Sequence, residues 1–411
     1  MLLQKPAFLL FYHTRAAEAS FGEWLGGLWH GLSLDCTVAG YVTAFPVVVV
    51  LASFWIPLSQ RVWRIILTVY FSLIALVTAA IFAVDLNLYG YWGFRLDGSV
   101  LIYLADPGEA LASASWGEVL RQIIIMLVYA GAMIWSYRRI LRLFRVEPVS
   151  LRGRIVPTVA ALLIGGLTFL AIRGGVTVAT ANVSKVYFSS NMFLNHAATN
   201  PVFSFLSSVG DNENYAEAYP FFEEERRKTL FEELRGNRPG ADAGTPRLLR
   251  SDRPNVVLIL LESFGRTIMD ETVNGEPVMP NMQRFKREGV WFENFFANSF
   301  RTDRGQVAVL CGFPAQTTMS IMKLPRKSAT LPSLARSLGR EGYRSVFMYG
   351  GDLNFTNQAS FMYSTGWEEL IWQKDMQLDA PTSKWGYADD VVVDLFGDEV
   401  EALGRAEQPF L

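Results

Sequence analysis

The apolar residues of this chain are concentrated before residue 175, where they form long runs, whereas the remainder alternates short apolar runs with polar stretches. A helix needs about 20 apolar residues to cross a bilayer. Four runs are predicted to do so, at residues 36–56, 65–84, 123–137 with their flanks, and 155–172. Arg121 and Arg138 crowd the third run, for which a buried core helix is the alternative.

Basic residues predict the orientation of these spans, because loops rich in Lys and Arg face the cytoplasm. The connections between the first two and the last two spans carry arginines, whereas the loop at 86–119 has Arg95 against four acidic residues. The C-terminal part is therefore expected outside the cytoplasmic membrane. Residues 6–12 are too short for a signal peptide. We interpret them as the remnant of a fifth span and expect the complete protein to extend further at its N-terminus.

Short strand and helix patterns alternate from residue 254 onwards, which predicts an α/β domain with a largely parallel sheet. Strands are expected at 255–261, 290–297 and 343–349, and helices at 281–288, 303–310, 331–340 and 387–403. The charges of residues 219–235 predict a solvated helix leaving the membrane surface. The expected domains are a helical transmembrane bundle at 1–175, a juxtamembrane helix and linker at 176–253, and the α/β domain at 254–411.

Composition agrees with a membrane part joined to a soluble part. The 411 residues are 51% hydrophobic and 18% charged, and the net charge of −2 gives no indication of a nucleic-acid partner. The two cysteines, Cys36 and Cys311, lie far apart and predict no disulfide framework.

The strongest candidate for chemistry is the pair Glu262 and Thr302. Glu262 ends the predicted strand 255–261, and ligands of open α/β sheets collect at the carboxyl ends of strands. Thr302 precedes a predicted helix, whose first N–H groups and dipole favour anions. A carboxylate and a hydroxyl there can hold a divalent cation and present an activated nucleophile. The alternative is that Glu262 solvates the strand end and Thr302 caps the helix.

Further polar residues are candidates for substrate binding. Arg304, two residues after Thr302, is suited to phosphoryl oxygens, as is Arg301. For each arginine an exposed position or a structural ion pair is the alternative, and for Arg301 this alternative is favoured. The candidates after the glycine pair at residues 350–351 are Asp352, Asn354 and Asn357. Ordinary turn chemistry is the alternative for these three.

Several catalytic classes lack their motifs. The chain has neither a Gly-x-x-x-x-Gly-Lys-Ser/Thr phosphate loop nor a Gly-x-Ser-x-Gly elbow. All three histidines, His13, His30 and His196, precede the α/β domain, and His196 is predicted to be structural.

Two motifs, residues 255–264 (Asn-Val-Val-Leu-Ile-Leu-Leu-Glu-Ser-Phe) and 301–305 (Arg-Thr-Asp-Arg-Gly), resemble the lipoteichoic acid synthase branch of the alkaline phosphatase/sulfatase superfamily. The membrane plan is similar as well, since that branch has five spans before a sulfatase-like domain. The resemblance implies that Glu262 is a metal ligand and that Thr302 is both a metal ligand and the nucleophile. It also implies Mn²⁺ as the metal, with Mg²⁺ or Zn²⁺ as alternatives.

The resemblance implies an activity at the bacterial cytoplasmic membrane. Its enzymes move glycerol phosphate from a phospholipid to an envelope glycolipid, glycan or polymer through a phospho-threonine. The family's further Asp and His ligands are absent here and are expected beyond Leu411. Tyr349, Thr356 and Gln358 stand where the synthases have substrate-contacting His, Trp and Arg, which makes glycerol phosphate doubtful. An ester hydrolase and a non-catalytic envelope-binding protein are the alternatives, and residues 1–411 alone are expected to be inactive.

Overall fold

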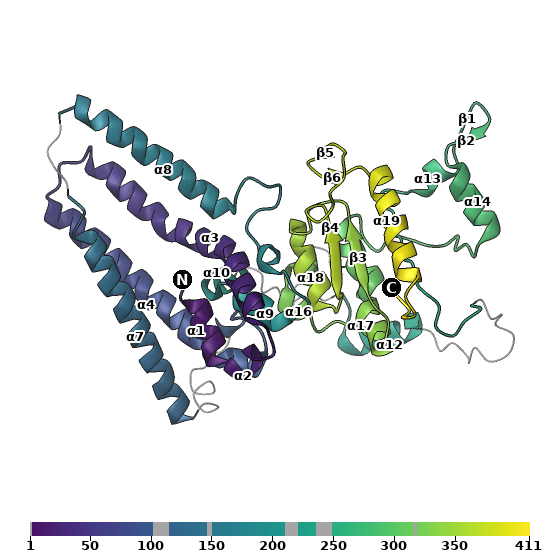
Figure 1. Ribbon diagram of the computed structural model, residues 1–411, viewed down its shortest axis with the longest axis horizontal. Helices are drawn as coiled ribbons and strands as arrows, with labels where there is room; N and C mark the ends of the chain where they lie inside the picture. Colours follow the sequence, from purple (N-terminus) through teal and green to yellow (C-terminus); the bar gives the residue numbers. More distant parts are fainter. Residues whose placement is uncertain (1, 102–114, 146–149, 210–220, 236–248, 316–318) are drawn as a thin grey trace. The chain divides into compact units, whose positions relative to one another are not determined.

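The computed structural model describes residues 2–101, 115–145, 150–209, 221–235, 249–315 and 319–411 (Figure 1). The chain divides into two compact units, Met1–Pro254 and Asn255–Leu411.

The first unit is built on helices α3 (Phe21–Ser53), α4 (Gln60–Trp92), α7 (Trp116–Leu141) and α8 (Ile155–Arg173). By length and composition, these four can cross a membrane, as predicted. They pack in two pairs, α3 with α8 and α4 with α7 (Figure 1). Capping boxes start two of them: Ser20 with Glu23 begins α3, and Ser115 with Glu118 begins α7.

The apolar run at residues 6–12 lies mostly in α1 (Gln4–Phe11), which is followed by α2 (His13–Ala16). With eight residues, α1 is too short to cross a bilayer. Its Phe8 is fully buried among the aromatic side chains of the bundle. Lys5 forms a buried ion pair with Asp35 of α3, and Asp35 also accepts a hydrogen bond from Asn200 at 2.7 Å. The run therefore forms part of the packed bundle.

Arg95, the one cation of the predicted loop at 86–119, is buried. Its guanidinium lies 3.3 Å from the Asp85 carboxylate and 4.3 Å from the centre of the Phe8 ring. Asp85 also accepts the backbone N–H of Leu96 at 2.8 Å. The contacts fix the chain where it leaves α4.

A short turn η1 (Arg152–Arg154) precedes α8, and after α8 the chain forms η2 (Val183–Val186), α9 (Met192–Ala198) and α10 (Pro201–Ser208). His196 of α9 is buried, and its Nδ1 lies 3.0 Å from the hydroxyl of Tyr89. Burial lowers its pKa to about 3, helped by the charges of Arg95 and Arg15. The position fits the structural role predicted for this histidine.

The buried His196 predicts a pH dependence of stability. The folded protein keeps the imidazole neutral down to about pH 3, whereas the unfolded chain takes up the proton below about 6.5. Stability is therefore lost as the pH falls through this window. We expect the thermal midpoint of His196→Gln to fall less on acidification than that of the wild type. His13→Gln, which removes an exposed histidine, is the control, and an unchanged slope in His196→Gln would contradict the neutral buried state.

A parallel strand pair forms the centre of the second unit. β3 (Val346–Tyr349) and β4 (Glu369–Trp372) lie side by side (Figure 1), with Tyr349 opposite Trp372. The segment 409–411 continues the sheet beside β3: the N–H of Val346 donates to the carbonyl of Leu411 at 2.9 Å. On its other side, the N–H of Val256 donates to the carbonyl of Phe410 at 2.8 Å. The parallel arrangement confirms the predicted sheet type.

Helices cover this sheet and enclose the core. They are α15 (Thr302–Cys311), α16 (Pro325–Ser328), α17 (Leu334–Arg340), α18 (Gln358–Ser364) and α19 (Asp389–Gly404), with short turns η3 (Ile321–Lys323) and η4 (Phe355–Asn357). Earlier elements are α13 (Arg266–Met269), the hairpin β1 (Thr272–Val273) with β2 (Glu276–Pro277), and α14 (Pro280–Glu288). Leu310, Met322 and Phe361 are among the core side chains. The predicted helices at 281–288 and 303–310 are confirmed.

Two of the predicted strands do not form. Residues 255–261 are not assigned as a strand, and apolar side chains such as Ile259 and Leu261 are exposed. Residues 290–297 also form no strand, and Phe296 is exposed. The physical reason is the same in both cases. A strand needs a hydrogen-bonding neighbour, and among the described residues these segments have such a neighbour only at Val256.

Candidate active site

Glu262 lies where the extended segment after Pro254 ends, and its side chain is exposed. The next residue, Ser263, adopts a left-handed backbone with φ 63°, which is uncommon for a residue other than glycine. Burial raises the pKa of Tyr349 at the end of β3, and the nearby charge of Glu262 raises it further. The charge of Glu262 thus acts on a residue at the carboxyl end of β3.

Thr302 is the first residue of α15, and its side chain is exposed. Arg301 before it has an extended backbone, so the chain turns into the helix at Thr302. Helix N-termini favour anions because their first N–H groups have no intrahelical acceptor. In α15 the N–H of Arg304 is already used, since it donates to the carbonyl of Arg301 at 3.1 Å. Val307 and Leu310 anchor the helix in the core. The predicted position of Thr302 at a helix N-terminus is confirmed.

The charged neighbours of Thr302 are largely engaged within the protein. Arg301 pairs with Asp303 at 3.4 Å, which is the structural alternative stated for that arginine. The Asp303 carbonyl accepts the hydroxyl of Ser320 at 3.0 Å. Arg304 is buried, with its guanidinium 5.5 Å from the centre of the Phe300 ring. Of these residues, Thr302 and Arg301 face solvent.

The three substrate-binding candidates after β3, Asp352, Asn354 and Asn357, differ in the contacts that they make. The Asp352 carboxylate accepts both the backbone N–H of Asn354 at 2.9 Å and its side-chain amide at 2.8 Å, as in an ordinary turn. Asn357 is buried, with a left-handed backbone (φ 64°), and its amide donates to the carbonyl of Lys323 at 3.4 Å. The side-chain oxygen of Asn357 has no hydrogen-bond partner among the described residues.

The short turn η3 connects these regions. It packs against α15 on one side and against η4 on the other. Thr302 and Asn357 therefore stand on elements that share a neighbour. The structure records no hydrogen bond from Glu262 to Thr302.

The glycine pair after β3 permits a close backbone approach, but the approaching segment belongs to the same chain. A Cβ at Gly351 would lie 2.5 Å from the carbonyl oxygen of Trp385, in the turn between β5 (Thr382–Ser383) and β6 (Gly386–Tyr387). Trp385 also contacts Phe355 edge-on, with ring centres 5.9 Å apart. Trp385 was not identified from the sequence, where Trp-Gly after a polar stretch is only a weak turn signal.

Gly386 should be the least replaceable glycine of this region. It has φ 113°, and an added Cβ would lie 2.1 Å from the carbonyl oxygen of Gly350. We expect Gly386→Ala to lower the free energy of unfolding by about 3 kcal/mol. Gly397→Ala in the open middle of α19 is the matched control and should be neutral or slightly stabilising. Equal thermal midpoints for the two variants would contradict the strain argument.

The described residues do not complete a metal site by themselves. They contain no group of three or more His, Cys, Asp or Glu side chains arranged to hold an ion. Glu262 and Thr302 supply two oxygen donors, whereas Zn²⁺ takes about four ligands and Mg²⁺ about six.

Cys311, at the end of α15, is not a competing nucleophile. It is buried, and burial raises the pKa of its thiol to about 11. The reactive thiolate is therefore disfavoured at neutral pH.

Comparisons with known proteins find similarity in the second unit. Residues 254–411 match the family model described as Sulfatase. The phosphoglycerol transferase I of Xanthomonas campestris is 36% identical over 172 residues, which cover 39% of this chain and 24% of that protein. The protein of the same name from Salmonella paratyphi B is 28% identical over 165 residues, 38% of this chain and 22% of the relative. The chain thus spans about a quarter of the length of these relatives.

Two solved structures are also similar. One is a protein of the alkaline phosphatase superfamily from Vibrio parahaemolyticus, 29% identical over 32% of each chain with a TM-score of 0.31. The other is the lipoteichoic acid synthase LtaP from Listeria monocytogenes, 19% identical over 38% of each chain with a TM-score of 0.36. By the family match, a sulfatase-type α/β domain follows the four long apolar helices.

Proposed function

From the sulfatase-type domain at residues 254–411 we infer that the full-length protein is a membrane-anchored phosphotransferase. It moves a phospho-head group from a phospholipid to an envelope glycan, glycolipid or polymer. The observation that carries this proposal is the exposed Thr302 hydroxyl at the N-terminus of α15, within a segment that matches the family. Relatives named phosphoglycerol transferase I support glycerol phosphate as the first head group to test.

The reaction we propose has two displacements. The Thr302 oxygen attacks phosphorus of the lipid phosphodiester, the phosphorus–oxygen bond to diacylglycerol breaks, and the proton of the hydroxyl is lost as diacylglycerol takes one up. An acceptor hydroxyl then attacks the phospho-threonine, gives up its proton, and the Thr302 oxygen leaves and regains one. The N-terminal end of α15, through its dipole and its first N–H groups, is proposed to stabilise the charge on the phosphoryl oxygens in both steps.

Glu262 and Thr302 would supply part of the coordination of a divalent ion. Mn²⁺ is the first candidate for this ion, with Mg²⁺ or Zn²⁺ as alternatives. Such an ion lowers the cost of deprotonating the Thr302 hydroxyl and neutralises charge on the phosphoryl group. The α/β domain is proposed to lie outside the cytoplasmic membrane, where envelope acceptors are found.

An ester hydrolase is the second candidate function. Sulfatase-type hydrolysis of sulfate esters uses a modified cysteine or serine, and a threonine in that position favours phosphoryl transfer. The test supplies purified full-length protein with a phospholipid labelled in its head group. Label on an envelope glycan supports transfer, and release of free head group phosphate alone would support the hydrolase.

A further inference from the structure

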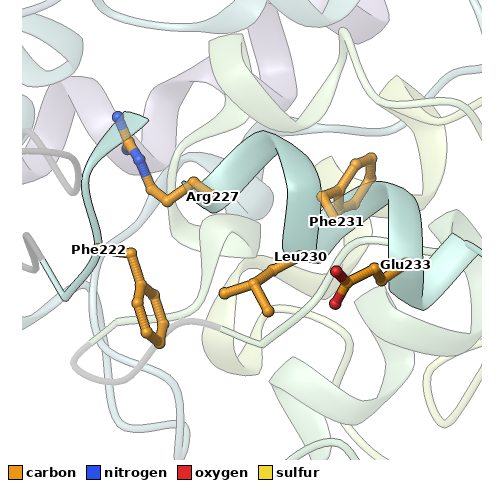
Figure 2. Close-up of a pocket in the computed structure, with 5 residues that line it drawn as sticks. All are labelled: Phe222, Arg227, Leu230, Phe231 and Glu233. Atoms are coloured by element: carbon orange, nitrogen blue, oxygen red, sulfur yellow. The ribbon is translucent and has the colours of Figure 1, made fainter. Parts of the chain in front are cut away.

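Helix α12 (Glu224–Arg235) is not polar on all sides, although its charges predicted a solvated helix. An open hollow of about 450 Å³ lies along it. Figure 2 shows the five lining side chains, one before the helix and four on it: Phe222, Arg227, Leu230, Phe231 and Glu233. The hollow is therefore bordered mainly by apolar groups.

These apolar groups face solvent to an unusual degree. Phe222 is 55% exposed and Phe231 is 58% exposed, and Phe221, which precedes Phe222, is 74% exposed. Apolar surface in water costs about 25 cal/mol per Å² relative to buried surface. Several aromatic rings exposed together indicate a surface that contacts another apolar phase.

The helical register separates apolar from acidic positions. Arg227, Leu230 and Phe231 are spaced i, i+3 and i+4, which places them on one face. At about 100° per residue, Glu225 and Glu232 fall on the opposite face. An arginine beside an apolar stripe can bury its methylene chain while its charged end stays among polar groups. Glu233, the one acid that lines the hollow, pairs with Arg226. A cation and apolar side chains together, with Glu225 and Glu232 turned away, match a layer of lipid head groups above acyl chains.

Two ion pairs lie along α12. Lys228 bonds with Glu224 at 2.9 Å, and Arg226 lies 3.8 Å from Glu233. These exposed pairs contribute little to stability, but they leave the helix without a strong net charge. Apolar contact is therefore the main attraction that this surface offers.

We propose that this face of α12, with Phe222, lies in the interface of the bilayer that the four long helices cross. Those helices tether it: Arg173 ends the last of them, and residues 174–223 lead to α12. Tethering makes the contact intramolecular, so an amphipathic helix of modest affinity stays bound. The contact keeps the α/β domain within reach of lipid head groups. This last consequence rests on the proposed function, whereas the bilayer contact itself does not.

Fluorescence quenching tests the contact without measuring activity. In the full-length protein, Cys36→Ala and Cys311→Ala remove the two cysteines of residues 1–411. Phe231→Cys is added to this background and labelled with an environment-sensitive dye. The labelled protein is reconstituted in vesicles of phosphatidylethanolamine and phosphatidylglycerol. Thr229→Cys, on the opposite side of the same helix, is the matched control. Nitroxide-labelled lipids should quench the dye at position 231 roughly threefold more than at 229.

Two results would overturn the proposal. One is equal quenching by nitroxide lipids at the two positions. The other is a dye at 231 that is shielded from both lipid nitroxide and aqueous iodide, because a protein surface then covers the face. Unchanged thermal midpoints of both labelled proteins confirm that the comparison is made on folded chains.

Discussion

Thr302→Ala in the full-length protein should lower turnover of a phospholipid donor by about 10⁴-fold, because the variant has no oxygen to attack phosphorus. Its fold should not change, since the Thr302 side chain is exposed and Arg301 makes the turn into α15 with no side-chain cap. Membrane insertion and the thermal midpoint should therefore match those of the wild type. Initial rates of head-group transfer give the measurement.

Two variants sharpen the test of Thr302. Thr302→Ser keeps a hydroxyl and should retain measurable turnover, whereas Thr272→Ala on the exposed hairpin strand β1 should retain all of it. A phosphate ester on Thr302, found by mass spectrometry after brief exposure to donor, would identify the intermediate directly. Undiminished turnover in Thr302→Ala would exclude the proposed mechanism.

The membrane helices were predictable because their signal is local. A bilayer requires one continuous apolar run per span, and each run is visible without knowledge of its neighbours. The helix boundaries extend beyond the runs, as in α7, where Ser115 and Glu118 form a capping box before the apolar residues begin. The burial of Arg95 was not predictable, since it depends on Asp85 and Phe8, which reach it from other parts of the chain.

The α/β unit shows the same division between local and nonlocal information. Pro280 starts α14, and Thr302 starts α15, as their local signals predicted. Whether residues 255–261 form a strand depends on a hydrogen-bonding neighbour, and the apolar pattern of the segment does not reveal whether one is present. The β1–β2 hairpin was missed although its Asn274-Gly275 turn, with both residues at positive φ, carries a strong local signal.

For the site, the sequence identified side chains but not their surroundings. Both Glu262 and Thr302 are exposed, as reactive groups must be. Asp352 instead bonds with Asn354 in a turn, because a short carboxylate finds nearby N–H groups more readily than a distant ligand. Residue type therefore suggested candidate chemistry, and the hydrogen-bond partners show which candidate side chains are engaged within the protein.

Glu262→Gln should weaken divalent-ion binding by the full-length protein by about 100-fold and lower turnover at limiting metal by a similar factor. The amide keeps the size of the side chain but removes the negative charge that attracts the ion. Because Glu262 is exposed, its replacement should leave the thermal midpoint of the apo protein unchanged. Calorimetric titration with Mn²⁺ measures the affinity, and added metal should restore part of the activity.

The control for Glu262 is Glu271→Gln, which neutralises another exposed glutamate of the same unit and should leave Mn²⁺ affinity unchanged. The comparison separates a ligand from a general contribution to surface charge, which salt would screen. If both variants bind Mn²⁺ as the wild type does, Glu262 is not a metal ligand, whatever happens to turnover. If only Glu262→Gln loses affinity while Thr302→Ala binds Mn²⁺ but is inactive, the two side chains have separate roles, one in holding the ion and one in attacking phosphorus.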